Sequence, residues 1–313
     1  MVARFLWVML LLLAVPTLGQ TAHRIAEFQI ALDRQLFSPG CIDDHIGTQT
    51  RAALRAWQVA RSEKVTGVFD EATAEALKLE APAFINYEIT TNDFARIGPA
   101  PEGWRERAEQ ESMPYQTALE LVAEKFHASQ RFIRALNPQI PWDSLNTPTN
   151  ALVPNVEFDA KPPKAGEVRI NLAQKWLTVY DGEGKLCAFF PCSIGRDKMK
   201  RPVGELQIVA VAPNPNYTFN PAVFPESPEA QAIGTKLIIP PGPNNPVGVL
   251  WLSIGRAPGS EGPPLTGYGI HGTPKPEEVG RTESHGCFRL ANFNAERLLK
   301  MVTVGTPVIV EEE

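Results

Sequence analysis

Ser284-His285-Gly286-Cys287-Phe288-Arg289-Leu290 is the stretch around which the C-terminal half of the chain is organised. It places a thiol two residues after an imidazole, and a second His-Gly pair, His271-Gly272, begins 16 residues before Cys287. A thiol becomes a good nucleophile when a neighbouring base or positive charge favours the thiolate. Glycine lets backbone N–H groups approach a reacting carbonyl closely. The stretch therefore predicts a cysteine acyl-transfer site.

The same side chains also allow a metal-binding interpretation. His271, His285 and Cys287 are residue types that bind zinc, and a structural zinc site takes four ligands. The carboxylates nearest in the sequence are Glu278 and Glu283, and nothing in the sequence fixes either of them beside the other three. The acyl-transfer interpretation is therefore preferred, and no metal or other cofactor is expected.

Length and charge narrow the class of protein. The chain has 313 residues, which is enough for two or three domains. Its formal net charge is −5, so no strong basic field favours nucleic acid as a partner. Neither quantity indicates an oligomeric state.

The N-terminus carries a short apolar segment. Arg4 precedes an apolar run over residues 5–15, and small and polar residues follow up to Gln20. Such a run is shorter than the roughly 20 residues that span a bilayer and is typical of a secretory signal. An uncleaved membrane anchor is the alternative. We predict a signal peptide over residues 1–20, cleaved near Gly19, and export to the periplasm or cell envelope.

Three more cysteines accompany Cys287. Cys187 and Cys192 lie in one predicted strand, where five extended residues span about 16 Å, beyond the reach of a disulfide. Cys41 lies in a different region of the chain. We therefore expect no disulfide framework, with Cys187 or Cys192 buried as a small apolar residue.

Residues 22–80 show a helical pattern. In the first predicted helix, apolar side chains recur at spacings of three and four: Ile25, Phe28, Leu32 and Leu36. Further helices are predicted over Thr50–Ala60 and Glu71–Leu79, with Asp70 as the N-cap of the last. The pattern predicts a small three-helix bundle.

This bundle resembles the small peptidoglycan-binding module found beside cell-wall enzymes. The matching elements are Ile25-Ala26-Glu27-Phe28-Gln29, Ile42-Asp43, Gly47-Thr48-Gln49-Thr50, Ala53-Leu54, Trp57-Gln58, Gly67-Val68-Phe69 and Thr73-Ala74-Glu75-Ala76-Leu77. The resemblance implies that the glycan and peptides of the cell wall are partners of the protein. A generic helical spacer is the alternative interpretation.

A linker and a second module are predicted over residues 84–158. Helices are expected over Thr117–His127 and from Ser129, as N-cap, to Leu136. The segment resembles a small α+β LysM-type module, which recognises the glycan of peptidoglycan. The resemblance rests on Tyr115, Ala123-Glu124-Lys125-Phe126-His127 and Leu136-Asn137-Pro138. A structural copy that binds no glycan is the alternative.

The last 150 residues read as a mostly β domain, predicted over residues 165–312. The expected strands alternate with turns: Val168–Val179, Leu186–Ile194, Gly204–Ala212, Gly248–Ile254 and Thr306–Val310. The first two are predicted to pair as a hairpin. The long, loop-rich segment 213–246 is expected to shape a substrate cleft. A helix capped by Asn292 or Asn294 is predicted to end near Val302.

This domain resembles the catalytic domain of the bacterial L,D-transpeptidases (the YkuD type). The resemblance is carried by His271-Gly272-Thr273, Gly280, Ser284-His285-Gly286-Cys287-Phe288-Arg289-Leu290, Asn171-Leu172-Ala173-Gln174-Lys175-Trp176-Leu177-Thr178-Val179-Tyr180 and Pro202-Val203-Gly204-Glu205-Leu206. It covers residues 167–311 and implies a multidomain cysteine acyltransferase: a three-helix bundle, a LysM-like module and a mostly β catalytic domain.

The resemblance assigns roles to the residues of the two motifs. Cys287 is the nucleophile, His271 the general base and acid, and the Gly272 carbonyl orients His271. Backbone N–H groups near Gly286 form the oxyanion hole. Three side chains have supporting or substrate-binding roles: Ser284, His285 and Arg289. A structural ion pair is the alternative role for Arg289.

The implied reaction is acyl transfer from a tetrapeptide stem, with release of D-alanine. The acceptor is an amine of a second stem, which gives a 3→3 cross-link, or a lysine of an envelope protein. Two alternatives stay open: an L,D-carboxypeptidase that uses water as acceptor, and an inactive wall-binding scaffold.

Overall fold

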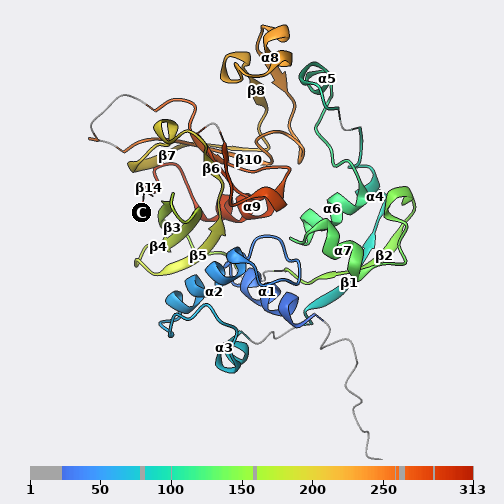
Figure 1. Ribbon diagram of the computed structural model, residues 1–313, viewed down its shortest axis with the longest axis vertical. Helices are drawn as coiled ribbons and strands as arrows, with labels where there is room; N and C mark the ends of the chain where they lie inside the picture. The colour runs from blue at the N-terminus through green and yellow to red at the C-terminus, as the bar shows by residue number, and fades with distance from the viewer. Residues whose placement is uncertain are drawn as a thin grey trace, which may run out of the picture.

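The computed structural model describes residues 23–77, 82–99, 101–157, 161–257, 259–260, 265–284 and 286–312. The predicted signal peptide and His285 lie outside this part of the chain. Within it, no helix combines the length and the apolar character needed to cross a membrane. Figure 1 shows the N-terminal helices in blue below a large sheet, with a separate green module beside them.

The first helices of the described chain form the predicted bundle. Their bounds are α1 Arg24–Arg34, α2 Thr48–Ala60 and α3 Glu71–Ala76. The predicted cap of α3 is confirmed, because a carboxylate oxygen of Asp70 accepts from Thr73 N at 2.8 Å. The predicted apolar face of α1 is only partly right. Ile25 and Phe28 are half-buried, while Gln29 and Asp33 are fully buried, because polar partners on other elements surround that face of α1.

The second module has a β–α–α–β order with further short helices between. Its elements are β1 Phe84–Ile89, α4 Thr91–Phe94, α5 Trp104–Ala108, α6 Ala118–Lys125, α7 Gln130–Leu136, η1 Trp142–Ser144 and β2 Thr149–Pro154. Strands β1 and β2 pair antiparallel along their whole length. The predicted helices are confirmed, and Ser129 Oγ caps α7 by accepting from Phe132 N at 3.1 Å. The sequence pattern did not indicate α4 or α5.

One mixed sheet dominates the C-terminal domain. Within the described residues it has eight strands in the order β13-β11-β10-β7-β14-β3-β4-β5. The bounds are β3 Ala165–Asn171, β4 Trp176–Asp181, β5 Leu186–Pro191, β7 Gly204–Pro213, β10 Leu250–Arg256, β11 Gly269–His271, β13 Phe288–Arg289 and β14 Pro307–Glu311. The predicted hairpin is confirmed, since β4 pairs antiparallel with β5. The single strand predicted over Val168–Val179 is wrong, because a turn at residues 172–175 divides it into β3 and β4, which pair antiparallel.

Shorter elements surround this sheet. They are β6 Ile194–Gly195, η2 Lys198–Lys200, β8 Tyr217–Phe219, η3 Pro221–Val223, α8 Pro228–Ile233, β9 Leu237–Ile239, η4 Pro276–Glu278, β12 Thr282–Ser284 and α9 Asn292–Met301. Helix α9 contributes Ala295, Leu298 and Met301 to the main apolar core. The predicted asparagine cap of α9 is wrong: its N-cap residue is Ala291. The Asn292 side chain instead donates to the Glu124 carboxylate at 3.0 Å and accepts from Val249 N at 3.3 Å.

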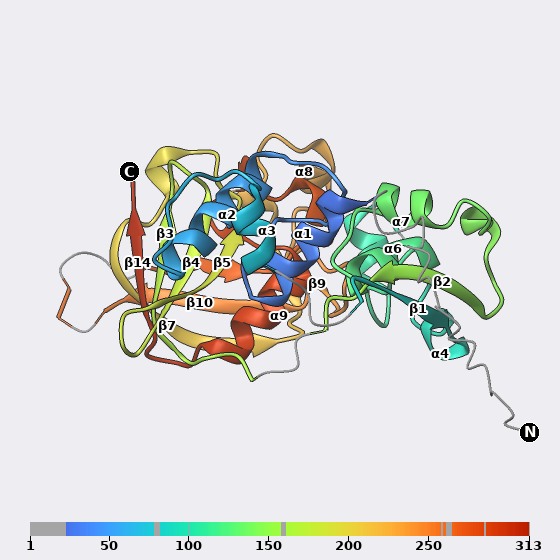
Figure 2. The same cartoon turned by 90° about the horizontal axis from the view of Figure 1, so that it is seen from below.

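The segment after α1 extends the large sheet. Ser38 N donates to Phe189 O, and Phe189 N donates to Leu36 O, both at 2.9 Å. Phe37 bridges Phe189 in parallel orientation, so this segment lies along β5, the last strand of the sheet. Helix α2 packs on the same strand, and Figure 2 shows α2 beside β5.

A buried ionic cluster joins the three parts of the chain. Asp33 of α1 accepts two hydrogen bonds from the Arg297 guanidinium of α9, at 2.7 and 2.8 Å. His127, after α6, contacts the same carboxylate through Nδ1 at 2.9 Å. The helical bundle, the second module and the C-terminal domain therefore share one polar contact in the interior.

Candidate active site

His271 ends β11 and is held between two strands. It lies opposite Trp251 of β10 and opposite Arg289 of β13 in the sheet register. Its side chain stacks on the Trp251 ring, with centroids 5.5 Å apart, and the residue is only 4% exposed. Nδ1 lies 2.6 Å from the Gly272 carbonyl oxygen. Because a carbonyl only accepts, Nδ1 carries the proton, and Nε2 keeps a free lone pair.

The surroundings of His271 keep its imidazole neutral. Burial is the main cause that lowers its pKa, to about 3, and the Arg289 charge lowers it further. The hydrogen bond to Gly272 acts in the opposite direction but is weaker. At neutral pH the side chain is therefore an unprotonated base.

Cys287 stands directly before β13 with a half-buried thiol. Its Sγ contacts the Gly267 carbonyl at 3.5 Å, and within the described residues no hydrogen bond joins it to His271. Burial raises the pKa of the thiol, although the Gly269 N–H and the Arg289 charge oppose that rise. The resting pair is thus a neutral thiol and a neutral imidazole.

The turn before Cys287 requires glycine. Gly286 has φ +141°, and a Cβ there would lie 2.9 Å from Lys200 O and 3.0 Å from the Tyr268 ring. Ser284 at the end of β12 supports this turn, since its Oγ donates to Cys287 O at 2.5 Å and accepts from Gly286 N at 3.3 Å. The predicted Ser284, Gly286 and Cys287 therefore lie together. His285 is outside the described residues, and its supporting role stays a prediction.

Arg289 brings positive charge to the site. Its Nη1 lies 3.5 Å from the Glu283 carboxylate, so the ion pair considered as an alternative is present. Its Nε is buried and has no hydrogen-bond partner within the described residues. The ion pair with Glu283 therefore leaves one donor of Arg289 without a partner among the described residues.

Three aromatic residues at the site were missed by sequence reasoning. Trp251 stacks on His271, Tyr268 lies against Gly286, and Tyr217 belongs to the β8–β9 hairpin. The pKa of Tyr217 is raised to about 12, first by burial and then by the Cys287 charge, which places Tyr217 within electrostatic reach of the thiol. For Trp251, the register of the predicted strand 248–254 was the available signal.

The other cysteines lie away from this constellation. Cys192 is fully buried in the core, and Cys187 is half-buried, with its thiol 3.3 Å from Val179 O. Over the described ranges, no group of three or more His, Cys, Asp or Glu side chains is arranged to share a metal ion.

Comparison with known proteins gives two family matches. Residues 165–310 match the family model of the YkuD L,D-transpeptidase catalytic domain. Residues 21–77 match that of a putative peptidoglycan binding domain.

Individual proteins similar to this chain carry the name L,D-transpeptidase. The putative L,D-transpeptidase YkuD of Bacillus licheniformis is 23% identical over 192 residues, 61% of this chain and 92% of that protein. The probable L,D-transpeptidase YbiS of Escherichia coli K12 is 26% identical over 232 residues, 72% of this chain and 68% of that protein. A solved structure of an L,D-transpeptidase from Mycobacterium smegmatis is 21% identical, covers 52% of this chain and 66% of that chain, and gives a TM-score of 0.35.

The domain match identifies a cysteine-dependent acyltransferase. Its sheet brings His271, at the end of β11, next to the strand that follows Cys287. Its C-terminal domain belongs to the L,D-transpeptidases, and a peptidoglycan-binding domain precedes it in the chain. Both expectations drawn from the sequence motifs are confirmed. The LysM-type assignment of the second module stays a prediction.

Proposed function

We propose that the protein is an exported L,D-transpeptidase that forms 3→3 cross-links in peptidoglycan through a thioester on Cys287. The observation that carries the proposal is the neutral, buried imidazole of His271, whose Nδ1–H is fixed on Gly272. Strand β11, which ends at His271, pairs with the strand that begins directly after Cys287. The domain match supports the peptide stems of the cell wall as substrate.

The first half-reaction forms the acyl-enzyme. Nε2 of His271 takes the thiol proton as Cys287 Sγ attacks the carbonyl carbon of the stem. Backbone N–H groups next to Gly286 stabilise the negative oxygen, and each such donor contributes about 10²–10³ in rate. The bond to D-alanine then breaks, and the imidazolium returns its proton to the leaving amine.

The second half-reaction consumes the thioester. An amine of a second stem attacks the thioester carbonyl and loses a proton to His271. The new amide leaves as the cross-link, and Cys287 regains its proton. We assign the buried Nε of Arg289 to a substrate carboxylate, since it has no partner among the described residues.

The upstream modules have a delivery role in this proposal. The peptidoglycan-binding domain, residues 22–80, and the LysM-like module, residues 84–158, hold the wall polymer near the catalytic domain, residues 165–312. Export through the signal at residues 1–20 places the enzyme in the periplasm or cell envelope with its substrate.

The test combines intact-protein mass spectrometry with product analysis on a soluble disaccharide-tetrapeptide. We expect a thioester adduct, release of D-alanine and a cross-linked dimer. Cys287→Ala should abolish all three, and His271→Ala should lower the acylation rate by about 10²-fold or more. Cys187→Ala is the matched control, because it removes a thiol elsewhere in the domain.

Two results would overturn parts of the proposal. Release of D-alanine without dimer, in the presence of acceptor amine, would mean that water is the acceptor. An adduct that persists in Cys287→Ala would mean that this thiol is not the nucleophile.

A further inference from the structure

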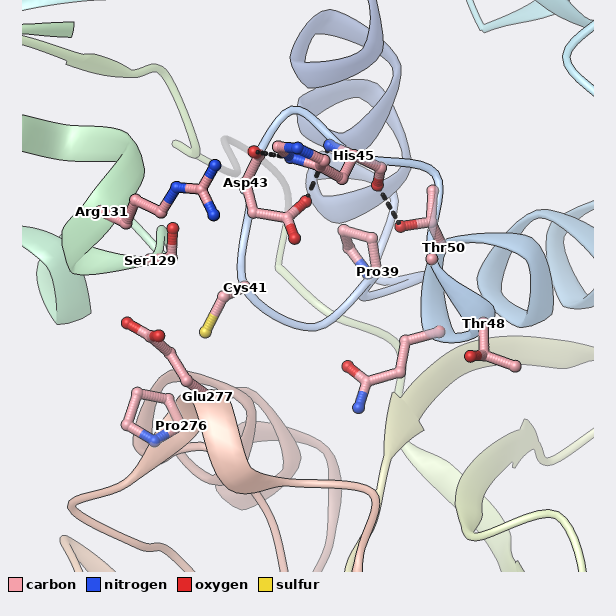
Figure 3. A pocket seen from close by; sticks show the side chains of 12 residues that line it. Pro39, Cys41, Asp43, His45, Thr48, Thr50, Ser129, Arg131, Pro276 and Glu277 are labelled. Atoms are coloured by element: carbon pink, nitrogen blue, oxygen red, sulfur yellow. Dashed lines mark hydrogen bonds between the residues drawn. The ribbon is translucent and has the colours of Figure 1, made fainter. Parts of the chain in front are cut away.

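A cavity of about 520 Å³ lies where the three parts of the chain meet, and Cys287 is not among the residues that line it. Figure 3 shows its walls: the loop between α1 and α2, the start of α7, and η4 of the catalytic domain. Pockets of roughly 300–1,000 Å³ are typical of sites for small ligands. Neither the catalytic motifs nor the proposed reaction uses this cavity.

Charged groups of both signs face the cavity and are not fully paired. Within the described residues, the Arg131 guanidinium has no ion pair or hydrogen bond, although Figure 3 shows it extended towards the Asp43 loop. Glu277 accepts from Gln130 N at 3.0 Å through one oxygen only. Asp43 uses one oxygen for Gln29 and His45 N, at 2.8 and 3.0 Å. One cation and two carboxylate oxygens therefore remain for a ligand.

The thiol in the cavity does not suit covalent chemistry. Figure 3 shows the Cys41 thiol pointing towards Glu277. Burial raises the pKa of this thiol, and the Glu277 and Asp43 carboxylates raise it further. A protonated thiol is a poor nucleophile, so Cys41 is not poised to react with a molecule in the cavity.

The position of the cavity connects it to the catalytic loop. Glu277 lies on the segment between β11, which ends at His271, and β12, which leads to Cys287. Gln49 Nε2 of the helical bundle donates to Val279 O on that segment at 2.6 Å. Further on, Ser193 Oγ accepts from Gly280 N at 3.0 Å. A ligand held by Glu277 therefore sits on the segment that joins the base to the nucleophile.

We propose that this cavity is a second, non-catalytic site for a peptide stem of the wall polymer. Arg131 binds a stem carboxylate, and Glu277 with Asp43 binds the ammonium group of a diamino acid. Charge-assisted pairs of this kind contribute more than neutral hydrogen bonds. The proposal rests on the proposed function, because it takes peptidoglycan as the substrate. It adds that the enzyme holds a stem of the polymer at a place remote from Cys287.

The test uses the full chain and a soluble disaccharide-tripeptide that ends in a diamino acid and carries a photoreactive group. Mass spectrometry of the cross-linked protein should locate label near Ser129, Arg131 or Glu277. Arg131→Ala should remove that label and weaken this binding by about tenfold or more in calorimetry. Arg134→Ala is the matched control, since Arg134 lies on the same helix and pairs with Asp143 instead.

Two further ligands test which groups of the fragment the cavity recognises. The same fragment with amidated carboxylates should bind weakly to the unchanged protein. Its affinity should be about that of the original fragment for Arg131→Ala. The disaccharide without peptide should not compete. Equal competition by the disaccharide, or binding and label unchanged in both Arg131→Ala and Glu277→Gln, would overturn the proposal.

Release of D-alanine from a free tetrapeptide separates this inference from the proposed function. Arg131→Ala should release D-alanine at the rate of the unchanged protein. Normal release with no label in the cavity would overturn the second site alone. Absence of release from the unchanged protein would instead overturn the proposed function.

Discussion

The surroundings of His271 remove its charge, as the role of a base that we propose for it requires. A free histidine has a pKa near 6.5 and would be largely protonated at pH 5. In this site burial, followed by the Arg289 charge, lowers the pKa to about 3. The cost of burying the ring is offset by its stacking on Trp251 and its hydrogen bond to Gly272.

The acid limb of the pH profile reports this lowered pKa. Since the imidazole of His271 stays unprotonated down to about pH 3, kcat/KM for D-alanine release should change less than about twofold between pH 7 and pH 5. An ordinary histidine would lose about 25-fold over that range, because most of it would be protonated at pH 5. Removing the charge with Arg289→Gln should move the acid limb to higher pH. A tenfold loss centred near pH 6.5 in the unchanged protein would contradict the prediction.

The motif residues were found from the sequence, and their neighbours were not. Cys287, Gly272 and His271 stand in a two-part signature whose chemistry is visible in the residue types. Tyr217 comes from a distant hairpin, and Ser193 Oγ accepts from Gly280 N and Arg281 N across the fold. Spacing along the chain gives no sign of such contacts, because they depend on how strands are ordered in the sheet.

Among the elements, the β8–β9 hairpin packs on a partner outside its own domain. Trp104 of α5 stacks on Phe219 with centroids 4.3 Å apart. Its backbone N donates to the Glu229 carboxylate of α8 at 2.7 Å, and Figure 1 shows α5 beside α8. At the base of the hairpin, Met113 N donates to Pro241 O at 2.8 Å. The second module therefore holds the element that brings Tyr217 to the thiol.

Truncating Trp104 should loosen the β8–β9 hairpin. Trp104→Ala removes an aromatic stack worth about 0.5–1.5 kcal/mol, so amide hydrogen exchange over residues 217–239 should accelerate by about 2- to 12-fold. The acylation rate should fall with it, because Tyr217 would leave the site more often. Arg105→Ala on the same helix is the control, since that side chain is exposed. Unchanged amide exchange in Trp104→Ala would contradict a stabilising role of α5 for the hairpin.

Long periodic elements were easier to predict than this hairpin. The β4–β5 pair and β14 follow from β-forming residues and turn glycines. Segment 213–246 was expected to be a loop, yet it contains β8, η3, α8 and β9. These elements are too short to be stable alone. Contacts of β9 and α8 with α5 stabilise them. Residue patterns in one segment cannot show a partner that lies more than 100 positions away.

At the scale of the whole molecule, the Asp33 cluster is a buried contact shared by the three parts of the chain. Burial alone would raise the pKa of Asp33, but Arg297 and His127 lower it to about 2. The stability that this carboxylate contributes is therefore present above its unfolded pKa, near 3.9, and is lost as pH falls towards 2. At neutral pH this contact between the parts is therefore a pair of full charges.

Breaking that pair should cost far more than breaking an exposed one. Arg297→Ala leaves the Asp33 carboxylate buried without its main partner, so urea unfolding should show a loss of about 3–5 kcal/mol. Arg134→Ala breaks the exposed pair with Asp143 and should cost less than about 1 kcal/mol. Similar losses in the two variants would mean that the buried cluster does not hold the domains.

The segment Leu36–Ser38 has a consequence for how the catalytic domain exists in the cell. It satisfies backbone groups of Phe189 on β5 that would otherwise face solvent. An uncovered strand of this kind is a template for pairing with another chain. A proteolytic fragment that begins near residue 161 would expose β5, with the apolar residues Leu186 and Phe189 that α2 covers in the full chain. Such a fragment would self-associate through the uncovered strand. The helical bundle therefore also protects the catalytic domain from pairing with other copies.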